Sequence, residues 1–211
     1  MSEQRQLFIM VGPSGVGKNS IVRKILDSLP NIFQMPTATT RLPRPDELNG
    51  REHYFFSEQE FSQLIAQGEL IEWQQVHGNL YGAMKSVLLK GFDSDNDFIA
   101  DLEVLGAQTI KKLFLDNVIL IFLIPPTLED LENRIRERGS ITEEEISIRL
   151  SRVRLEMSFI PKCDYLVIND NLDWATEQVK SIVLAERCRK HLNNFGIEEY
   201  LTERRSRDHE F

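Results

Sequence analysis

The sequence predicts an α/β fold built on a parallel sheet, and three observations favour it. Apolar runs of strand length alternate with helix-length amphipathic segments from near the first residue to about residue 190. The runs at residues 7–11, 98–100, 118–124 and 165–168 are apolar at successive positions, which is typical of strands buried on both faces. The first run leads at once into a glycine-rich turn and then a helical pattern. We therefore expect strand, turn and helix units around a buried sheet.

Composition and charge exclude several classes of protein. The 211 residues are 41% hydrophobic and 27% charged, which suits one domain with insertions and not a disordered chain. The net charge of -8 argues against binding nucleic acid or anionic membranes through bulk electrostatics. The longest apolar run, 118–124, is far shorter than the roughly 20 residues of a membrane helix, and the first residues lack the layout of a secretory signal. We expect a cytoplasmic protein with no nucleic-acid partner and no membrane contact.

The cysteines and histidines offer no metal or disulfide framework. Cys163 and Cys188 are too few for a disulfide scaffold, and they lack the clustered spacing of a zinc site. The four histidines are equally scattered. We expect both cysteines to be small buried residues in a reducing compartment.

Several helix starts can be read directly. Ser57 with Glu60, and Thr142 with Glu145, have the spacing of a capping box, in which each side chain satisfies a free backbone donor. The Pro-Pro-Thr sequence at 125–127 ends one strand and opens the next helix. These signals fix where three helices should begin.

Two stretches do not fit a simple doubly wound core. Residues 37–90 are rich in turn formers and polar residues, and residues 129–159 form an arginine-rich helical hairpin. We expect both to be insertions that close over substrates, the second as a lid. The predicted core then consists of residues 1–36, 91–128 and 160–190, with a tail at 191–211 that frays.

A phosphate-binding loop follows the first predicted strand. Its glycines let successive backbone N–H groups turn inward, the helix start adds a positive end, and the lysine reaches the terminal phosphates of a nucleotide. A plain glycine-rich turn is the alternative, but the strand before and the helix after favour phosphate binding. The candidate ATP-binding residues are Gly12, Pro13, Ser14, Gly15, Val16, Gly17, Lys18, Asn19 and Ser20.

The loop departs from the general motif at one position. Asn19 stands where a serine or threonine usually ligates Mg²⁺. Ser20, one residue later, or the Asn19 carbonyl could supply that oxygen instead. We expect Mg²⁺ to enter with ATP, with Ser20 as its candidate ligand and Asp101 acting through an intervening water.

A second set of charged residues points to a phosphate on the acceptor side. Arg41 and Arg44 lie three apart on a chain stiffened by prolines, and rigid guanidinium forks suit a doubly charged phosphate. Such a stretch by itself is also typical of a solvated loop. Asp101 and Glu103 follow the run at 98–100, at the carboxyl end of a strand where ligands bind in open α/β sheets, and this favours the functional interpretation.

At these residues the sequence resembles the guanylate kinase family over roughly residues 5 to 190. The resemblance rests on several motifs in the right order, namely the glycine loop, the Thr37 to Gly50 segment, Ile71-Glu72-Trp73, Gly78 to Gly82 and Asp101-Leu102-Glu103. It implies a P-loop kinase core with a five-stranded parallel sheet, an inserted GMP-binding domain and a helical lid. It also implies transfer of the ATP γ-phosphate to GMP or dGMP.

The resemblance carries roles onto matching positions. The catalytic residues would be Lys18, Arg41, Arg138 and Arg149, the last two closing from the lid onto the ATP phosphates. Asn169 would lie at the adenine pocket. The GMP-binding residues would be Thr37, Arg41, Arg44, Tyr54, Glu72, Tyr81, Gly82, Asp101 and Glu103, with Glu72 and Thr37 reading the guanine edge.

Three positions depart from the family pattern. The place of its phosphate-binding tyrosine is taken by His53, with Tyr54 next, so either the loop is shifted by one residue or His53 substitutes. Ala83 stands where a hydroxyl residue is common, and Glu103 is longer than the usual aspartate.

Other interpretations stay open. The lid arginines lie among many carboxylates, so most of them could form a salt-bridged, solvated helix pair. A kinase for another phosphorylated acceptor, such as a ribose phosphate, would share the same loop. A non-catalytic module that binds phosphopeptides through the acceptor-side arginines is the third possibility, although such domains tend to lose the donor loop. The sequence leaves the oligomeric state open.

Overall fold

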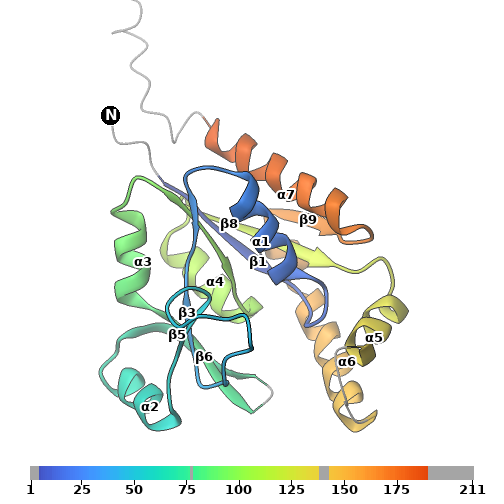
Figure 1. The fold of residues 1–211 in the computed structure, drawn as a ribbon, viewed down its shortest axis with the longest axis horizontal. Helices are drawn as coiled ribbons and strands as arrows, with labels where there is room; N and C mark the ends of the chain where they lie inside the picture. Colours follow the sequence, from blue (N-terminus) through green and yellow to red (C-terminus); the bar gives the residue numbers. More distant parts are fainter. Residues whose placement is uncertain (1–4, 77, 138–142, 190–211) are drawn as a thin grey trace, which may run out of the picture.

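A five-stranded parallel sheet forms the centre of the molecule (Figure 1). The computed structural model describes residues 5–76, 78–137 and 143–189. The strand order β2-β7-β1-β8-β9 is parallel throughout, which confirms the predicted α/β fold. The strands are β1 (Leu7–Val11), β2 (Ile32–Gln34), β7 (Asp97–Asp101), β8 (Val118–Ile124) and β9 (Tyr165–Ile168).

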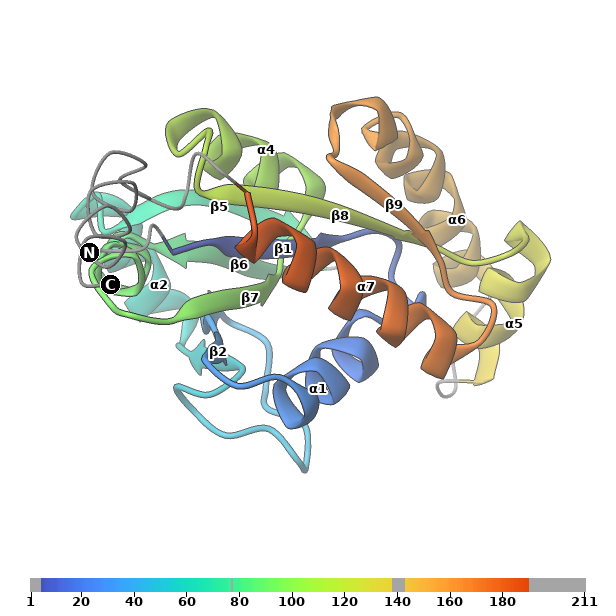
Figure 2. The same ribbon diagram turned by 90° about the horizontal axis from the view of Figure 1, so that it is seen from above.

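Helices cover both faces of this sheet, which explains its continuous apolar strands (Figure 2). Phe8 and Met10 of β1 pack with α1 (Lys18–Ser28) and α7 (Leu172–Arg187) on one face. Leu7, Ile9 and Val11 pack with α3 (Lys85–Phe92) and α4 (Val104–Leu113) on the other. Alternate side chains of a strand point to opposite faces, so a strand between two helical layers must be apolar at every position.

The edges of the sheet differ from what the sequence pattern predicts. The sequence pattern does not predict β2, because this strand has only three residues and Phe33, in its middle, is exposed. In β9, Leu166 and Ile168 are half exposed, so the prediction of burial on both faces is wrong for this strand. An edge strand has a neighbour on one side only, and its signal in the sequence is correspondingly weaker.

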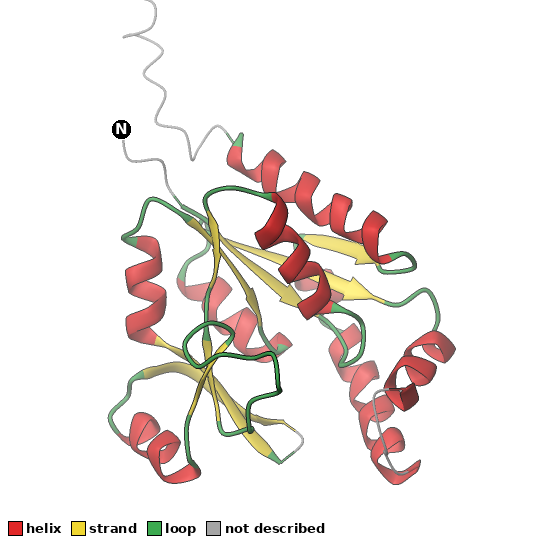
Figure 3. Cartoon of the chain, in the orientation of Figure 1, coloured by secondary structure: helices red, strands yellow, loops and turns green. Residues whose placement is uncertain are grey.

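The insertion region contains a second, four-stranded sheet in the order β4-β3-β6-β5 (Figure 3). β3 pairs in parallel with β4 and antiparallel with β6, which in turn pairs antiparallel with β5. The buried residues of this region form a small apolar cluster, with one side chain each from β3, α2 and β5, namely Ala38, Phe61 and Leu70. Its elements are β3 (Thr37–Thr39), β4 (His53–Phe55), α2 (Glu58–Ala66), β5 (Leu70–Val76) and β6 (Asn79–Met84).

The helical hairpin comprises α5 (Leu128–Glu137) and α6 (Glu143–Met157), which meet through an apolar cluster of their own. A short 3₁₀ helix, Ile160–Lys162, leads back to β9. As the prolines predict, α5 opens directly after residue 127, where the Thr127 hydroxyl accepts from the Asp130 amide at 3.0 Å. The capping box at Ser57 is confirmed at the start of α2, and Thr142 lies outside the described residues.

The cysteines are only partly as expected. Both thiols are free, and Cys163 packs partly buried against the cluster on the α4 side. Cys188 is exposed, so the prediction of burial is wrong there, because the residue caps the carboxyl end of α7 beyond the sheet. None of the helices in the described part of the chain is both long and apolar enough to span a bilayer.

Candidate functional site

A single cleft of about 800 Å³ collects side chains from the core, the second sheet and the hairpin. The carboxyl ends of the parallel strands open into it, as expected for an α/β sheet. Of the residues singled out from the sequence, those that line it are Ser14, Gly15, Gly17, Lys18, Asn19, Ser20, Thr37, Arg41, Arg44, His53, Glu72, Tyr81, Gly82, Asp101 and Glu103. The structure therefore brings the donor loop and the acceptor-side motifs to one cavity.

Two glycines of the loop are required by their surroundings. Gly12 has φ 135° and a Cβ there would lie 2.2 Å from the carbonyl oxygen of Leu123 in β8. Gly17 has φ 101° and a Cβ would lie 2.5 Å from the amide nitrogen of Asn169. That same amide donates to the carbonyl of Val16 at 2.7 Å. The loop is thus locked between β8 and the residue that follows β9.

Lys18 is held by acceptors close to the loop. Its ammonium donates to the carbonyls of Gly12 at 2.5 Å and Pro13 at 3.2 Å, and lies 3.7 Å from the carboxylate of Asp101. Burial raises the pKa of Asp101 above its ordinary value, and the nearby lysine opposes that shift. The two groups place a positive charge and a partly exposed carboxyl group with a raised pKa in the cleft.

A second recess of about 440 Å³ adjoins the loop on the other side. Asn169 lies there, buried, with its carbonyl accepting from Arg134 of α5 at 3.0 Å. The lining residues are Gly15, Gly17, Ser20, Arg134, Asn169, Asp170 and Leu172. This recess can take a flat group attached to the phosphates in the loop.

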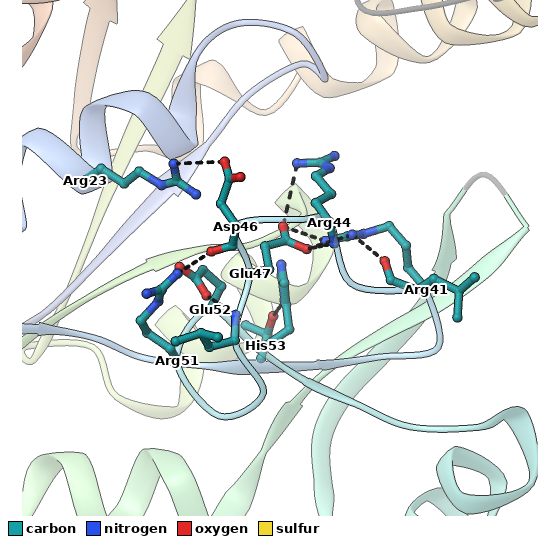
Figure 4. Close-up of polar contacts among 11 residues, drawn as sticks. Arg23, Arg41, Arg44, Asp46, Glu47, Arg51, Glu52 and His53 are labelled. Atoms are coloured by element: carbon teal, nitrogen blue, oxygen red, sulfur yellow. Dashed lines mark hydrogen bonds and ion pairs between the residues drawn. The ribbon is translucent and has the colours of Figure 1, made fainter.

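Glu47 organises the two acceptor-side arginines (Figure 4). It receives a bidentate pair of hydrogen bonds from Arg41, both at 2.9 Å, and one from the Arg44 amide at 2.8 Å. The Arg44 guanidinium lies 3.7 Å from the same carboxylate, whose side chain is only 3% exposed. Burial alone would raise the pKa of Glu47, but these hydrogen bonds outweigh it and lower the pKa. Glu47 is therefore a carboxylate that fixes the arginine pair at the cleft wall.

His53, and not Tyr54, faces the cleft. Its Nδ1 lies 2.7 Å from the Thr37 hydroxyl, and burial followed by the charge of Arg41 lowers its pKa to about 4. The imidazole is neutral at pH 7. Tyr54 lies on the opposite face of β4, where its ring packs on Phe56, so the structure does not bring Tyr54 into the cleft.

Four carboxylates line the same cleft as the arginine pair, namely those of Glu72, Asp101, Glu103 and Glu156. Burial and the charge of Glu103 raise the pKa of Glu72 to about 7, and the same two causes raise that of Glu156, on α6, to about 7. The Glu72 carboxylate packs so closely on Gly106 of α4 that a Cβ there would approach it to 2.3 Å. Asp101 completes the group. This side of the cleft can accept hydrogen bonds from a buried ligand with N–H donors.

Comparison with known proteins shows to which family this chain belongs. Residues 4–186 match the family model for guanylate kinase. The chain belongs to the guanylate kinase family. It is 38% identical to the guanylate kinase of Thermotoga maritima, over 94% of this chain and 95% of the relative, and 39% identical to that of Desulfitobacterium hafniense, over 87% and 91%.

A solved structure agrees with this membership. The guanylate kinase from Anaplasma phagocytophilum superposes with a TM-score of 0.73 at 25% identity, covering 97% of this chain and 96% of that one. As a member of the guanylate kinase family, the protein is a nucleoside monophosphate kinase.

Two of the arginines expected from the family fall outside the description, and one position that departs from the family packs in the core. Arg138 lies outside the described residues, and so does the side chain of Arg149, whose backbone belongs to α6. Ala83 is fully buried in the core cluster on the α4 side, so it does not leave a gap in the cleft wall. A hydroxyl at this position would have to fit into the packed core.

Three residues that shape the site are not predicted from the sequence, namely Glu47, Arg152 and Glu156. Glu47 follows Arg44 at a spacing of three, a local signal that could have linked them. Arg152 of α6 pairs with Glu103 at 3.0 Å and with Glu156 at 3.3 Å. The Arg152 to Glu156 spacing of four suits one helix face, but no sequence signal connects Arg152 with Glu103.

The donor loop suits a metal ion that arrives on the nucleotide. Ser20 and Asn19 are exposed at the start of α1 and line the cleft. Among the described residues, no group of three or more His, Cys, Asp or Glu side chains could hold a metal ion. Mg²⁺ keeps several waters and commonly binds through substrate phosphates with one or two protein oxygens, which is the arrangement these residues can offer.

Glu72 yields a prediction about stability. Because its pKa is about 7 in the folded chain and 4.5 ordinarily, the stability that its neutral form contributes is fully present below pH 4.5 and lost as the pH rises through 7. Glu72→Gln is neutral at every pH. Its melting temperature should exceed that of the wild type by an amount that grows between about pH 5 and about pH 8, as measured by thermal unfolding.

Glu60→Gln is the matched control. Hydrogen bonds from Ser57 lower the pKa of Glu60, so this variant should lose stability relative to the wild type as the pH rises through the acid range. A melting-temperature difference for Glu72→Gln that does not vary with pH would contradict a partly buried carboxylate with a raised pKa.

Proposed function

We propose that this protein transfers the γ-phosphate of ATP to GMP or dGMP and so forms ADP and the guanosine diphosphate. The observation that carries the proposal is the placing of Lys18, the Arg41 and Arg44 pair and the Glu72 carboxylate in one cleft. A phosphate donor and a phosphorylated acceptor with N–H donors on its base would both find matching groups there. Membership of the guanylate kinase family supports the same pair of substrates.

The donor would bind at the loop between β1 and α1. Backbone N–H groups of residues 12–20 and Lys18 would hold the phosphates, and the recess beside Asn169 would take the adenine. Arg138 and Arg149 would close on the phosphates from the hairpin, which would act as a lid. Ser20, with Asp101 acting through water, would hold the Mg²⁺ that enters with ATP.

The acceptor would bind across the second sheet. Arg41, Arg44 and Tyr81 would grip its phosphate, with His53 in the place of the family's tyrosine and the backbone at Gly82 close by. Glu72 would accept from the two N–H donors on the guanine edge, helped by Thr37. Asp101 and Glu103 would border the base and ribose. A carboxylate opposite adenine would meet no such pair of donors.

No general base is required for the transfer. A phosphate monoester has a second pKa near about 6, so its oxygen is nucleophilic at neutral pH. That oxygen would attack the γ-phosphorus, and the bond to the β-phosphate oxygen would break to release ADP. Catalysis would consist of alignment and charge neutralisation by Lys18 and the arginines, while Mg²⁺ would neutralise phosphate charge. Lid closure would exclude water and limit ATP hydrolysis.

The proposal includes the division of labour along the chain. Residues 37–90 would form the acceptor-binding insertion, residues 129–159 the lid, and the remaining segments up to 190 the core, with 191–211 as a tail. The boundary between the insertion and the core, at residues 90 and 91, falls within α3, because this helix ends at Phe92. We place this chemistry in the cytoplasm, where both nucleotides are available.

One observation favours a second acceptor class. The neutral His53 at the phosphate end replaces a phenol, and this substitution would suit a kinase for another phosphorylated acceptor such as a ribose phosphate. A phosphopeptide-binding module is less well supported, because Lys18 and the complete loop serve no purpose in it. A coupled assay with GMP, dGMP, AMP, UMP and ribose phosphates separates these alternatives.

Lys18→Ala tests phosphate transfer itself. The loss of a charge that acts mainly in the transition state should lower kcat by roughly 10²- to 10³-fold, measured in the coupled assay, with the far-ultraviolet circular dichroism unchanged. Lys24→Ala is the control on the same helix, because this exposed lysine pairs with Asp173 away from the cleft. Near-wild-type turnover by Lys18→Ala would remove the kinase assignment.

The base is tested by comparing acceptors. If Glu72 accepts from two guanine donors in a buried pocket, kcat/KM for GMP should exceed that for AMP by roughly 10⁴-fold. Glu72→Gln should lose most of this preference because the amide cannot accept from both donors. Comparable rates with GMP and AMP in the wild type would mean that the pocket does not read guanine.

A further inference from the structure

Arg152 lies on the second lid helix, α6, yet it contacts the acceptor side of the cleft. Its Nη2 donates to the Glu103 carboxylate at 3.0 Å, and its Nε lies 3.3 Å from that of Glu156. Glu156 is one turn further along the same helix, whereas Glu103 stands at the start of α4, in the core. The guanidinium therefore joins the lid to the core at the edge of the cleft.

The location of the three side chains shows how Arg152 can act. Their exposed fractions are 26% for Arg152, 30% for Glu103 and 8% for Glu156, so the contacts are partly shielded from water. Glu103 and Glu156 line the cleft, but Arg152 is not among the described residues that line it. Any effect of Arg152 on a bound nucleotide must pass through the carboxylates that it holds.

Glu103 is in a crowded position. The carboxylates of Glu72, Asp101 and Glu156 share the same cleft, and the charge of Glu103 raises the pKa of each of them, in addition to the larger effect of burial on each. Lys18 lies close to Asp101, while Arg152 makes the direct contact with Glu103. A charge placed among like charges is free to turn away from them unless a cation fixes it.

We propose that Arg152 is a positioning residue for the acceptor: it holds the Glu103 carboxylate at the base end of the cleft and so ties the second lid helix to the pocket that reads guanine. The inference rests on the proposed function, because Glu103 borders the acceptor only if GMP is the acceptor. The planar fork of arginine reaches two carboxylates at once, from Nη2 and from Nε. A lysine at this position would offer one point charge.

Steady-state kinetics with both substrates test the proposal. Arg152→Met keeps the apolar stem and removes the charge, and it should raise KM for GMP about fivefold to tenfold while KM for ATP and kcat change less than about twofold. Arg152→Lys should recover part of the loss. Arg154→Met is the matched control, because this arginine lies two residues along the same helix and is exposed; its constants should equal those of the wild type.

A double-mutant cycle tests whether Arg152 acts through Glu103. In a Glu103→Gln background the further change Arg152→Met should have little effect on KM for GMP, because the charge that it holds is gone. An unchanged KM for GMP in Arg152→Met would overturn the proposal. So would an equal effect in both backgrounds, or a parallel rise of both KM values with a lower melting temperature, which would indicate a structural role in the lid.

The wild-type enzyme separates this inference from the proposed function. If it does not phosphorylate GMP, the proposed function and the inference both fail. If it phosphorylates GMP efficiently and Arg152→Met behaves as the wild type does, only the inference fails.

Discussion

The site depends on one electrostatic constraint, namely that the cations in the cleft and beside it are held by oxygens of the chain itself. Lys18 is held by loop carbonyls beside Asp101, the arginine pair by Glu47, and Arg152 by Glu103 and Glu156. Long cationic side chains lose conformational freedom when they are fixed, and a charge without a partner in a partly buried cleft is costly. The fold meets both demands before any phosphate is bound.

Burial also determines the properties of the Glu72 carboxylate in the same cleft. Burying Glu72 against Gly106 raises the pKa of that carboxylate to about 7, which costs stability at neutral pH. In return the carboxylate is poorly solvated and can discriminate strongly between bases that do and do not supply donors. A site that reads a base in this way is expected to be less stable than a packed core of the same size.

The sequence predicts best what is encoded within a short stretch. The β1 strand, the loop and α1 are contiguous, so their pattern identifies both the fold class and a phosphate site, and the capping box at Ser57 fixes the start of α2 for the same reason. β2 is missed because it has only three residues, of which Ile32 alone is buried, and so short a segment carries almost no pattern. Cysteine is usually buried, which predicts an interior position for Cys188, but the residue is exposed because it lies at the end of a helix.

Features that depend on register or on distant partners could not be read from the sequence. Whether His53 or Tyr54 faces the cleft depends on the register of β4 against β3, since a shift by one residue exchanges the two faces. Arg152 meets Glu103 only because the hairpin folds back over the start of α4, 49 residues away along the chain. Ala83 matches a family position in sequence, but its packing in the core is a tertiary fact.

In the proposed function, the arginine pair held by Glu47 grips the acceptor through its phosphate. The most direct measurement is a calorimetric comparison of GMP and guanosine binding to the wild-type protein. Two charge-assisted hydrogen bonds, each worth about 1.5 to 3 kcal/mol, predict that GMP binds at least about a hundredfold more tightly than guanosine. Equal affinities for the two ligands would show that the arginines do not hold a phosphate, and would contradict the account of the acceptor site.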